Sequence, residues 1–152
     1  MRAQDAPRPA RLADAPAVSA LLGPLFERHI APTFPEERGR ALFRAFVEAE
    51  AVATRLSAGA VAFLIEDASG AAAYGERDGA HIRLLFVRDD RQGQGLSRRL
   101  LAALIEGVDA TAVTLNASDY ARPRYRRLGF VETGPRGIEA GVVQTPMRLS
   151  IS

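Results

Sequence analysis

The chain has 152 residues, of which 47% are hydrophobic and 25% are charged, as is typical of a single globular domain. It contains no cysteine, and all 20 of its basic residues are arginine. The absence of cysteine excludes disulfides, cysteine nucleophiles and cysteine-ligated metals. The absence of lysine excludes Schiff-base lysines and the lysine-containing phosphate loop. The net charge of only +2 gives no strong general attraction to nucleic acid.

The N-terminal segment predicts neither a secretion signal nor a membrane anchor. The longest apolar run, residues 58–65, is far shorter than the roughly 18 residues of a membrane span. Asp5 and Asp14 argue against an organelle-targeting peptide, because such peptides are poor in acidic residues. We therefore expect a cytoplasmic protein that does not contact a membrane.

The first 60 residues predict a short strand that ends near Leu12, followed by two helices. After Asp14, apolar residues recur with the three-and-four spacing of an amphipathic helix, until Pro32 and Pro35 interrupt it. A second stretch of this kind predicts one helix that ends near Gly59. Its apolar face consists of Leu42, Phe43, Phe46 and Val47.

The middle of the chain predicts a three-stranded meander and a long helix. Short apolar runs at Val61–Ile65, Ala71–Tyr74 and Ile82–Val87 are separated by turn signals. A leucine stripe that starts at Leu96 then predicts a helix, and Thr111–Leu115 predicts the next strand.

The last third predicts a short helix and two strands. Pro123–Leu128 has proline at the first helical position and glycine just past its end, as helices commonly do. Strands are expected at Phe130–Thr133 and Val142–Leu149, joined by a loop at Gly134–Gly141. There is no repeat and no long linker, so we expect residues 1–152 to form one domain of mixed α+β class.

The most informative segment is the glycine-containing loop between the third strand of the meander and the leucine-striped helix. The first N–H groups of a helix have no intrahelical partners and lie at its positive end, and Gly93 and Gly95 let a phosphate approach the backbone. Nearby positive charge comes from four arginines, Arg88, Arg91, Arg98 and Arg99.

Two other interpretations compete with a phosphate site. A dinucleotide fingerprint is disfavoured because its third glycine would fall on Arg98 and no acidic residue stands at the ribose distance. A loop that caps the helix and binds nothing is the simplest interpretation of two glycines alone.

Residues 87–97 resemble the pyrophosphate-binding motif of the GNAT superfamily, the acyl-CoA-dependent N-acyltransferases. Gln92 and Gly95 match this motif, whereas Ser97 replaces a smaller residue. The resemblance implies that acetyl-CoA is bound by the loop and the start of the helix, through Gln92, Gly93, Gln94, Gly95, Leu96, Ser97 and Arg98.

A second match follows at the family spacing. Asn116 leaves the expected strand, and Tyr125 to Phe130 resembles the family's Tyr-x-x-Leu-Gly-Phe ending. Residues 8–15 and 146–149 also resemble the family's first and last strands, so the resemblance spans nearly the whole chain. It implies the GNAT fold, a mostly antiparallel sheet of about six to seven strands flanked by about four helices.

The resemblance also implies direct transfer, in which an amine attacks the thioester of acetyl-CoA without a covalent enzyme intermediate. The strand at Leu85, Phe86 and Val87 would pair with pantetheine and offer a backbone N–H to the oxyanion. Tyr125 would protonate the departing thiolate, and Asn116 would contact pantetheine. Packing of Tyr125 in the core, and a cap or turn role for Asn116, are the alternatives.

The resemblance does not identify the general base. His81 lies near the place where some branches of the family carry a glutamate, and histidine titrates close to neutral pH. Strand alternation would put His81, Arg83, Leu85 and Val87 on one face. Water-mediated deprotonation of the amine is an equal alternative, and a lone strand histidine is often an incidental residue.

The sequence therefore predicts an acetyl-CoA-dependent N-acetyltransferase that uses no metal and acts on a small-molecule or peptide amine. A non-catalytic acyl-CoA-binding module is the alternative. The arginines from Arg122 to Arg127 invite a nucleic-acid interpretation, but no recognised nucleic-acid motif accompanies them. A homodimer is compatible with a sheet edge near Val142–Leu149.

Overall fold

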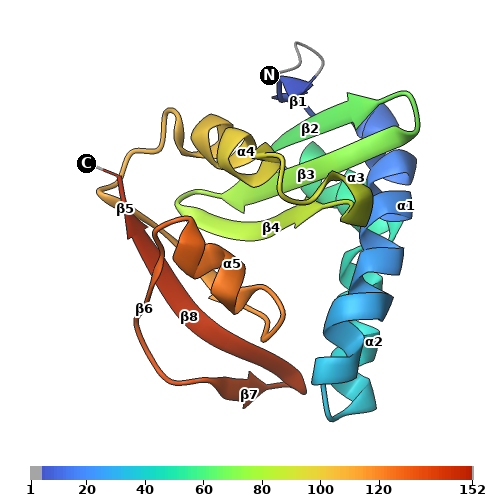
Figure 1. Cartoon of the computed structure of the whole chain (residues 1–152). Coiled ribbons are helices and arrows are strands. Elements are labelled where there is room, and N and C mark those ends of the chain that lie inside the picture. The colour runs from blue at the N-terminus through green and yellow to red at the C-terminus, as the bar shows by residue number, and fades with distance from the viewer. Residues whose placement is uncertain (1–4, 152) are drawn as a thin grey trace.

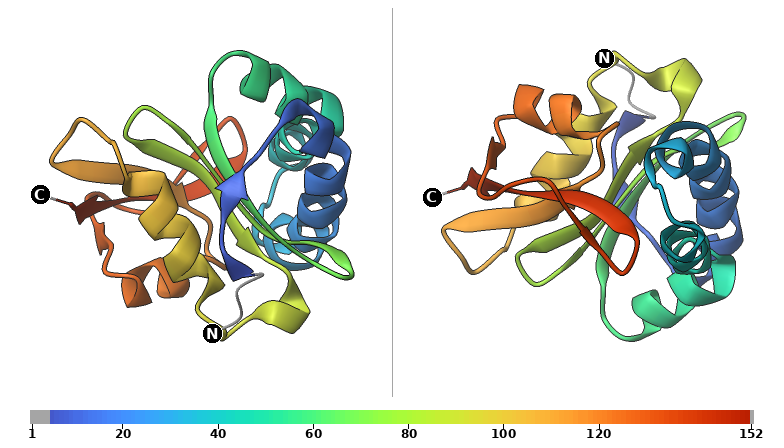
Figure 2. Two further views of the ribbon diagram at one scale, coloured as in Figure 1. Left: turned by 90° about the horizontal axis from the view of Figure 1, so that it is seen from above. Right: turned by 90° about the horizontal axis from the view of Figure 1, so that it is seen from below.

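The computed structural model describes residues 5–151, which form one twisted sheet covered by helices on both faces (Figures 1 and 2). The sheet has eight strands, in the order β1-β2-β3-β4-β5-β8-β6, and β7 pairs with β8 outside this path. The strands are β1 (Arg8–Pro9), β2 (Val61–Asp67), β3 (Gly70–Asp78), β4 (His81–Val87), β5 (Ala112–Ala117), β6 (Val131–Glu132), β7 (Gly137–Glu139) and β8 (Val142–Ser150).

Five α-helices cover the sheet. One face carries α1 (Ala15–Leu25), α2 (Glu37–Phe46) and α3 (Ala49–Ser57), and the other carries α4 (Leu96–Ile105) and α5 (Arg122–Arg127) (Figure 2). Short helical turns at Leu12–Asp14, Phe26–Ile30, Ala31–Thr33 and Asp89–Arg91 complete the helical structure of the described residues. None of the helices in residues 5–151 is both long and apolar enough to cross a membrane.

The sheet is antiparallel except at its centre, where β4 and β5 run parallel. Only two residue pairs join them, His81 with Thr114 and Ile82 with Leu115. Beyond these pairs the two strands diverge, so the β5-facing backbone edge of Leu84–Val87 has no strand partner. This opening lies between α4 and α5 (Figure 1).

The mixed α+β class and the meander are confirmed, but several element boundaries were predicted wrongly. The second helix is two helices, α2 and α3, because Val47 and Glu48 leave helical geometry between them. The expected loop at Gly134–Gly141 contains β7, which forms a hairpin with β8. β5 extends through Ala117, so Asn116 lies within the strand.

The hairpin turn between β7 and β8 accounts for the glycines at two positions, Gly141 in the turn and Gly39 in α2. Ala140 and Gly141 both have positive φ, as a tight hairpin turn requires. A Cβ on Gly39 of α2 would lie only 1.9 Å from the Gly141 carbonyl oxygen. Glycine at position 39 therefore lets α2 pack directly on this turn.

The expectation that Val142–Leu149 lies at a sheet edge is wrong. β8 is paired with β5 on one side and with β6 and β7 on the other, because the chain folds back after α5 and fills the remaining edge. The predicted free edge for pairing of β8 with a second copy is therefore absent from the described residues.

A buried polar group ties the N-terminal helices to the sheet. Glu76 of β3 is fully buried, and its carboxylate accepts hydrogen bonds from Tyr74 at 2.8 Å and from the Arg55 Nε at 2.7 Å. The Arg55 guanidinium also lies 3.8 Å from the centre of the Phe46 ring. This arrangement satisfies a charge that would otherwise be costly in the core.

We expect Arg55→Met to lower the free energy of unfolding by about 3 kcal/mol, because buried Glu76 would keep only Arg83, at 3.5 Å, as a cation. Urea unfolding measures this change. The exposed pair of Arg38 with Glu36 supplies the control, and Arg38→Met should cost less than about 1 kcal/mol. A similar loss in both variants would contradict the assignment of Arg55.

Candidate active site

Three cavities surround the point where β4 and β5 separate. The first is a narrow space of about 50 Å³ that lies against Leu85, Phe86 and Val87. The second, of about 370 Å³, opens at the start of α4 and shares Val87, Gln92 and Ser97 with the first. The third, also about 370 Å³, lies beside α2 and the start of β4.

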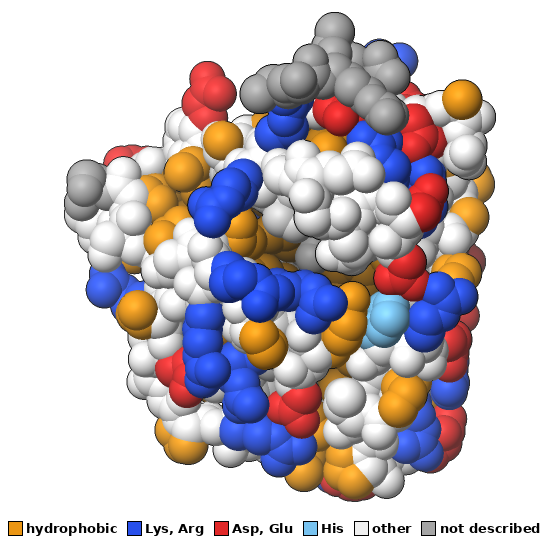
Figure 3. Space-filling model, in the orientation of Figure 1, with side chains coloured by type: hydrophobic (Ala, Val, Ile, Leu, Met, Phe, Trp, Pro, Cys, Tyr) orange, Lys and Arg blue, Asp and Glu red, His pale blue; other side chains and the backbone are white. Residues whose placement is uncertain are grey.

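The second cavity has the features of an anion site. Gly93 and Gly95 both have left-handed φ, and Gly95 caps α4 without a side chain, so no side chain satisfies the first N–H groups of the helix. Arg98, Arg124 and Arg127 line the same cavity. In Figure 3 arginine side chains follow one lip of the hollow that crosses this face of the molecule.

Two of the four arginines expected to supply charge near the loop form ion pairs within the protein. Arg88 and Arg91 both donate to Asp67, at 2.6 and 2.8 Å, and Arg91 also donates to Asp5. The Arg91 side chain is only 6% exposed. Its charge is therefore neutralised within the protein, although the residue still lines the cavity wall.

Two glutamines of the loop have different positions. The Gln92 side chain donates to the Val87 carbonyl at 2.8 Å and lines both the first and the second cavity. Gln94 instead accepts from the Arg91 Nε at 2.7 Å and lines neither cavity. Gln94 thus stabilises the loop through its hydrogen bond with Arg91.

Tyr125 of α5 lies in the wall of the first cavity, opposite the unpaired part of β4. It is 7% exposed and packs edge-on against Phe130. Burial raises the pKa of its phenol well above the ordinary value, so the hydroxyl stays protonated at neutral pH.

His81 lies apart from Tyr125, in the third cavity with Arg83 and Asn116. Its Nδ1 is 2.8 Å from the Thr114 hydroxyl. Burial lowers the pKa of His81, and the neighbouring Arg83 lowers it further, so the imidazole is neutral at physiological pH.

The predicted sharing of one strand face by His81, Arg83, Leu85 and Val87 is wrong. The register between β3 and β4 shifts between Ile82 and Leu84, which leaves Arg83 as an extra residue. A β-bulge of this kind reverses the alternation of side chains. Leu85 and Val87 consequently face α4, whereas His81 and Arg83 line the third cavity.

Asn116 is likewise not brought to the cavity of Tyr125. Its β5 neighbours Leu115 and Ala117 point into the core beneath α4, so alternation turns Asn116 towards the opposite face. There it lines the third cavity together with Ser118.

Two stacked phenylalanines separate the first and third cavities. Phe86 of β4 lines the first cavity and Phe43 of α2 lines the third, with ring centroids 6.4 Å apart and nearly parallel planes. Two ligands can therefore approach the divergence of β4 and β5 through separate cavities.

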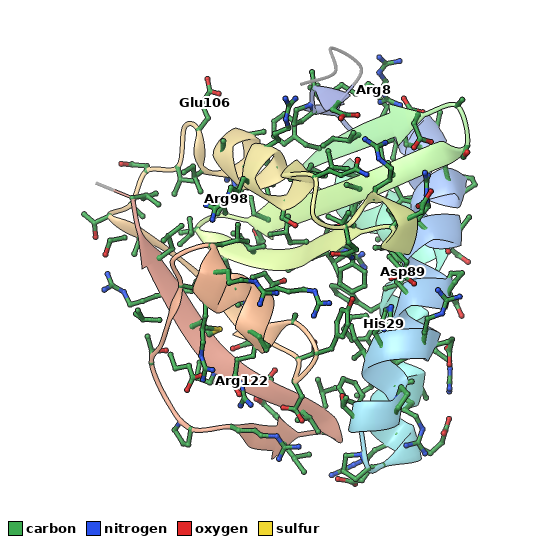
Figure 4. The ribbon with its side chains drawn as sticks, in the orientation of Figure 1. Arg8, His29, Asp89, Arg98, Glu106 and Arg122 are labelled. Carbon is green, nitrogen blue, oxygen red and sulfur yellow. The ribbon has the colours of Figure 1, made fainter. Side chains whose placement is uncertain are left out.

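The sequence pattern did not identify His29 as a site residue. Its ring lines the first cavity, stacks on Tyr120 with centroids 4.2 Å apart, and bonds to Asp89 at 2.8 Å (Figure 4). Burial acts to raise the pKa of Asp89, but hydrogen bonds from His29 and Arg28 hold that pKa below its ordinary value. Sixty residues separate His29 from Asp89, so no local motif indicates their contact.

Comparison with known proteins agrees with this geometry. A family profile described as an acetyltransferase (GNAT) domain matches residues 30–151. No curated protein is significantly similar to the chain in sequence.

Solved structures share the whole fold. A GCN5-related N-acetyltransferase from Rhodopseudomonas palustris is 25% identical with a TM-score of 0.82, over 96% of this chain and 95% of that one. PaiA N-acetyltransferase from Thermoplasma acidophilum, solved with coenzyme A, is 12% identical with a TM-score of 0.74, over 95% and 98% of the two chains. YncA from Salmonella typhimurium, solved with acetyl-CoA, is 18% identical with a TM-score of 0.70, over 96% and 93%.

We expect Asp67→Asn to lower the free energy of unfolding by about 1.5–3 kcal/mol at pH 7, because Arg88 and Arg91 lose their shared carboxylate. Hydrogen bonds from these arginines hold the pKa of Asp67 below its ordinary value. The stabilisation is therefore complete above about pH 4, the unfolded value, and declines as the pH falls towards the lower folded value.

Urea unfolding of both proteins at pH 7 and pH 3 tests this expectation. Asp90→Asn is the control, because Asp90 pairs with Arg88 but is 65% exposed. A difference between Asp67→Asn and the unmodified protein that grows on acidification would contradict the sign.

Proposed function

Because the chain belongs to the GNAT acetyltransferase family, we propose that it is an acetyl-CoA-dependent N-acetyltransferase that transfers the acetyl group directly to a primary amine. The observation that carries the proposal is the continuity of the first two cavities, from the start of α4 to Tyr125 along the unpaired edge of β4. A long, thin donor with a charged end matches that shape.

In this proposal the pyrophosphate of acetyl-CoA binds at the start of α4. Backbone N–H groups at Leu96, Ser97 and Arg98 act as donors there, and Arg98 and Arg127 supply positive charge. The pantetheine arm continues past Gln92 into the narrow first cavity. Its amides pair with the backbone of β4, whose polar groups otherwise lack a strand partner.

The chemistry then takes place beside Leu85, Phe86 and Val87. The amine attacks the thioester carbonyl, and a backbone N–H of β4 stabilises the negative charge that develops on the oxygen. Tyr125 donates its proton to the sulfur as the carbon–sulfur bond breaks. No cluster of three or more His, Cys, Asp or Glu side chains that could hold a metal ion occurs among residues 5–151.

The acceptor enters through the third cavity, beside α2 and the start of β4. His81 lies there as a neutral imidazole and is the proposed acceptor of the ammonium proton, with water as the alternative route. The walls combine the aromatic rings of Phe34, Phe43 and Phe46 with polar groups, which suits a small-molecule or peptide amine. We place the reaction in the cytoplasm.

We expect Gly95→Asp to weaken coenzyme A binding at least about tenfold, because it adds a negative charge beside the pyrophosphate. Isothermal calorimetry with coenzyme A measures the affinity. Gly107→Asp is a matched control, because Gly107 has φ +78° against +79° at Gly95 and equally open surroundings. Equal weakening in both variants, or no binding by the unmodified protein, would refute the assigned site.

We expect Tyr125→Phe to lower kcat about 100-fold while coenzyme A affinity is unchanged, because only the proton donor is removed. Release of free thiol from acetyl-CoA with a panel of primary amines measures the rate. If no amine supports turnover although coenzyme A binds, the protein is a non-catalytic acyl-CoA-binding module instead.

A further inference from the structure

His29 is held in the wall of the first cavity by three segments that are distant in sequence. It lies in the wide π-helical turn Phe26–Ile30, which continues α1 and turns the ring towards the cavity. Asp89, just after β4, bonds to its Nε2, and Tyr120, before α5, stacks on its face. Its side chain is 23% exposed.

The contacts define which nitrogen of His29 is free. The Asp89 carboxylate is ionised and can only accept, so Nε2 carries the proton that it donates at 2.8 Å. In the neutral ring Nδ1 is then an unprotonated acceptor. The other charged groups here are Arg28, which pairs with the same carboxylate, and Arg124, which lies over the far face of Tyr120.

The proposed reaction leaves Tyr125 deprotonated and does not by itself return a proton to it. Once it has protonated the sulfur, it is an anion in an almost fully buried position, where charge is unfavourable. The imidazole of His29 lines the same narrow cavity, and its Nε2 is bonded to the carboxylate of Asp89. Among the described residues that line this cavity, His29 is the only imidazole, a group whose ring nitrogens can both accept and donate a proton.

We propose that His29, oriented by Asp89 and Tyr120, is a proton relay that returns a proton to Tyr125 during acyl transfer. This inference rests on the proposed function. Attack forms the carbon–nitrogen bond and leaves the nitrogen positively charged, and the carbon–sulfur bond then breaks as Tyr125 protonates the sulfur. His29 Nδ1 takes the proton that the new amide nitrogen loses and passes it through water to the Tyr125 oxygen, so that both residues end the cycle unchanged.

The role differs from that of His81, which removes a proton from the ammonium before attack. Hydroxylamine separates the two steps, because it is largely unprotonated at neutral pH and needs no prior deprotonation. Its reaction with acetyl-CoA gives acetohydroxamate and free coenzyme A with no net proton release. The relay is still required, because the attacking nitrogen must lose a proton while the sulfur gains one.

The test measures thiol release from acetyl-CoA with hydroxylamine, corrected for the enzyme-free reaction. Glutamine at position 29 can still donate to Asp89 and stack its flat amide on Tyr120, but it cannot carry a proton. We expect His29→Gln to lower kcat about 100-fold. Arg28→Gln is the matched control, because it removes the exposed neighbour of the same carboxylate and should leave kcat unchanged.

Two further measurements separate a relay from a packing role. His29→Gln should bind coenzyme A as tightly as the unmodified protein in calorimetry, and added imidazole should restore part of the rate of His29→Ala. Unchanged kcat in His29→Gln overturns the relay, as does a rate loss that is matched by lost coenzyme A affinity and is not restored by imidazole.

The outcome also distinguishes this inference from the function on which it rests. If the unmodified protein releases thiol with hydroxylamine or another amine and His29→Gln does so equally fast, only the relay fails. If the unmodified protein releases no thiol with any amine, the proposed function fails and the relay fails with it.

Discussion

The separation of two parallel strands is the constraint on which the rest of the structure depends. β4 and β5 share only two residue pairs before they diverge, and the edge of β4 from Leu84 to Val87 is left without a strand partner. Backbone N–H and C=O groups are rarely left unpaired inside a protein, because an unsatisfied group costs about 1–3 kcal/mol. An edge of this kind inside a sheet is stable when a ligand or water satisfies it. The unpaired edge of β4 thereby suits the amides of the proposed pantetheine arm.

The charges around this opening are divided between structure and ligand binding. Arg88 and Arg91 are neutralised by Asp67 and by other carboxylates, and they fix the loop before α4 to the β2–β3 turn. Arg98 and Arg127 line the second cavity, where an anion can reach them. A chain whose only strong cation is arginine can thus use the same side chain for both purposes, because the surroundings decide which charge remains available.

The aromatic residues divide the space around the diverging strands into two approaches. Phe43 and Phe86 stack between the first and third cavities, while Tyr120 forms a row with His29 on one face and Arg124 on the other. A donor and an acceptor can therefore occupy separate cavities and meet where the strands part. His81 lines the third cavity and Tyr125 the first, so the proposed deprotonation of the ammonium group and protonation of the sulfur use different cavities.

The sequence by itself determined the local features. Short apolar runs separated by turn signals predicted the meander, the leucine stripe predicted α4, and Gly93 and Gly95 predicted a phosphate loop at its start. Each of these predictions depends on residues close together in the chain. The resemblance to the GNAT motifs identified Gln92 and Tyr125, which the structure places in one continuous pair of cavities. Only the tertiary structure decided the rest. The bulge at Arg83 moved His81 away from Leu85, strand alternation turned Asn116 to the opposite face, and contact over sixty residues joined His29 to Asp89. Register shifts and long-range contacts depend on how whole elements pack, and no short stretch of sequence contains that information.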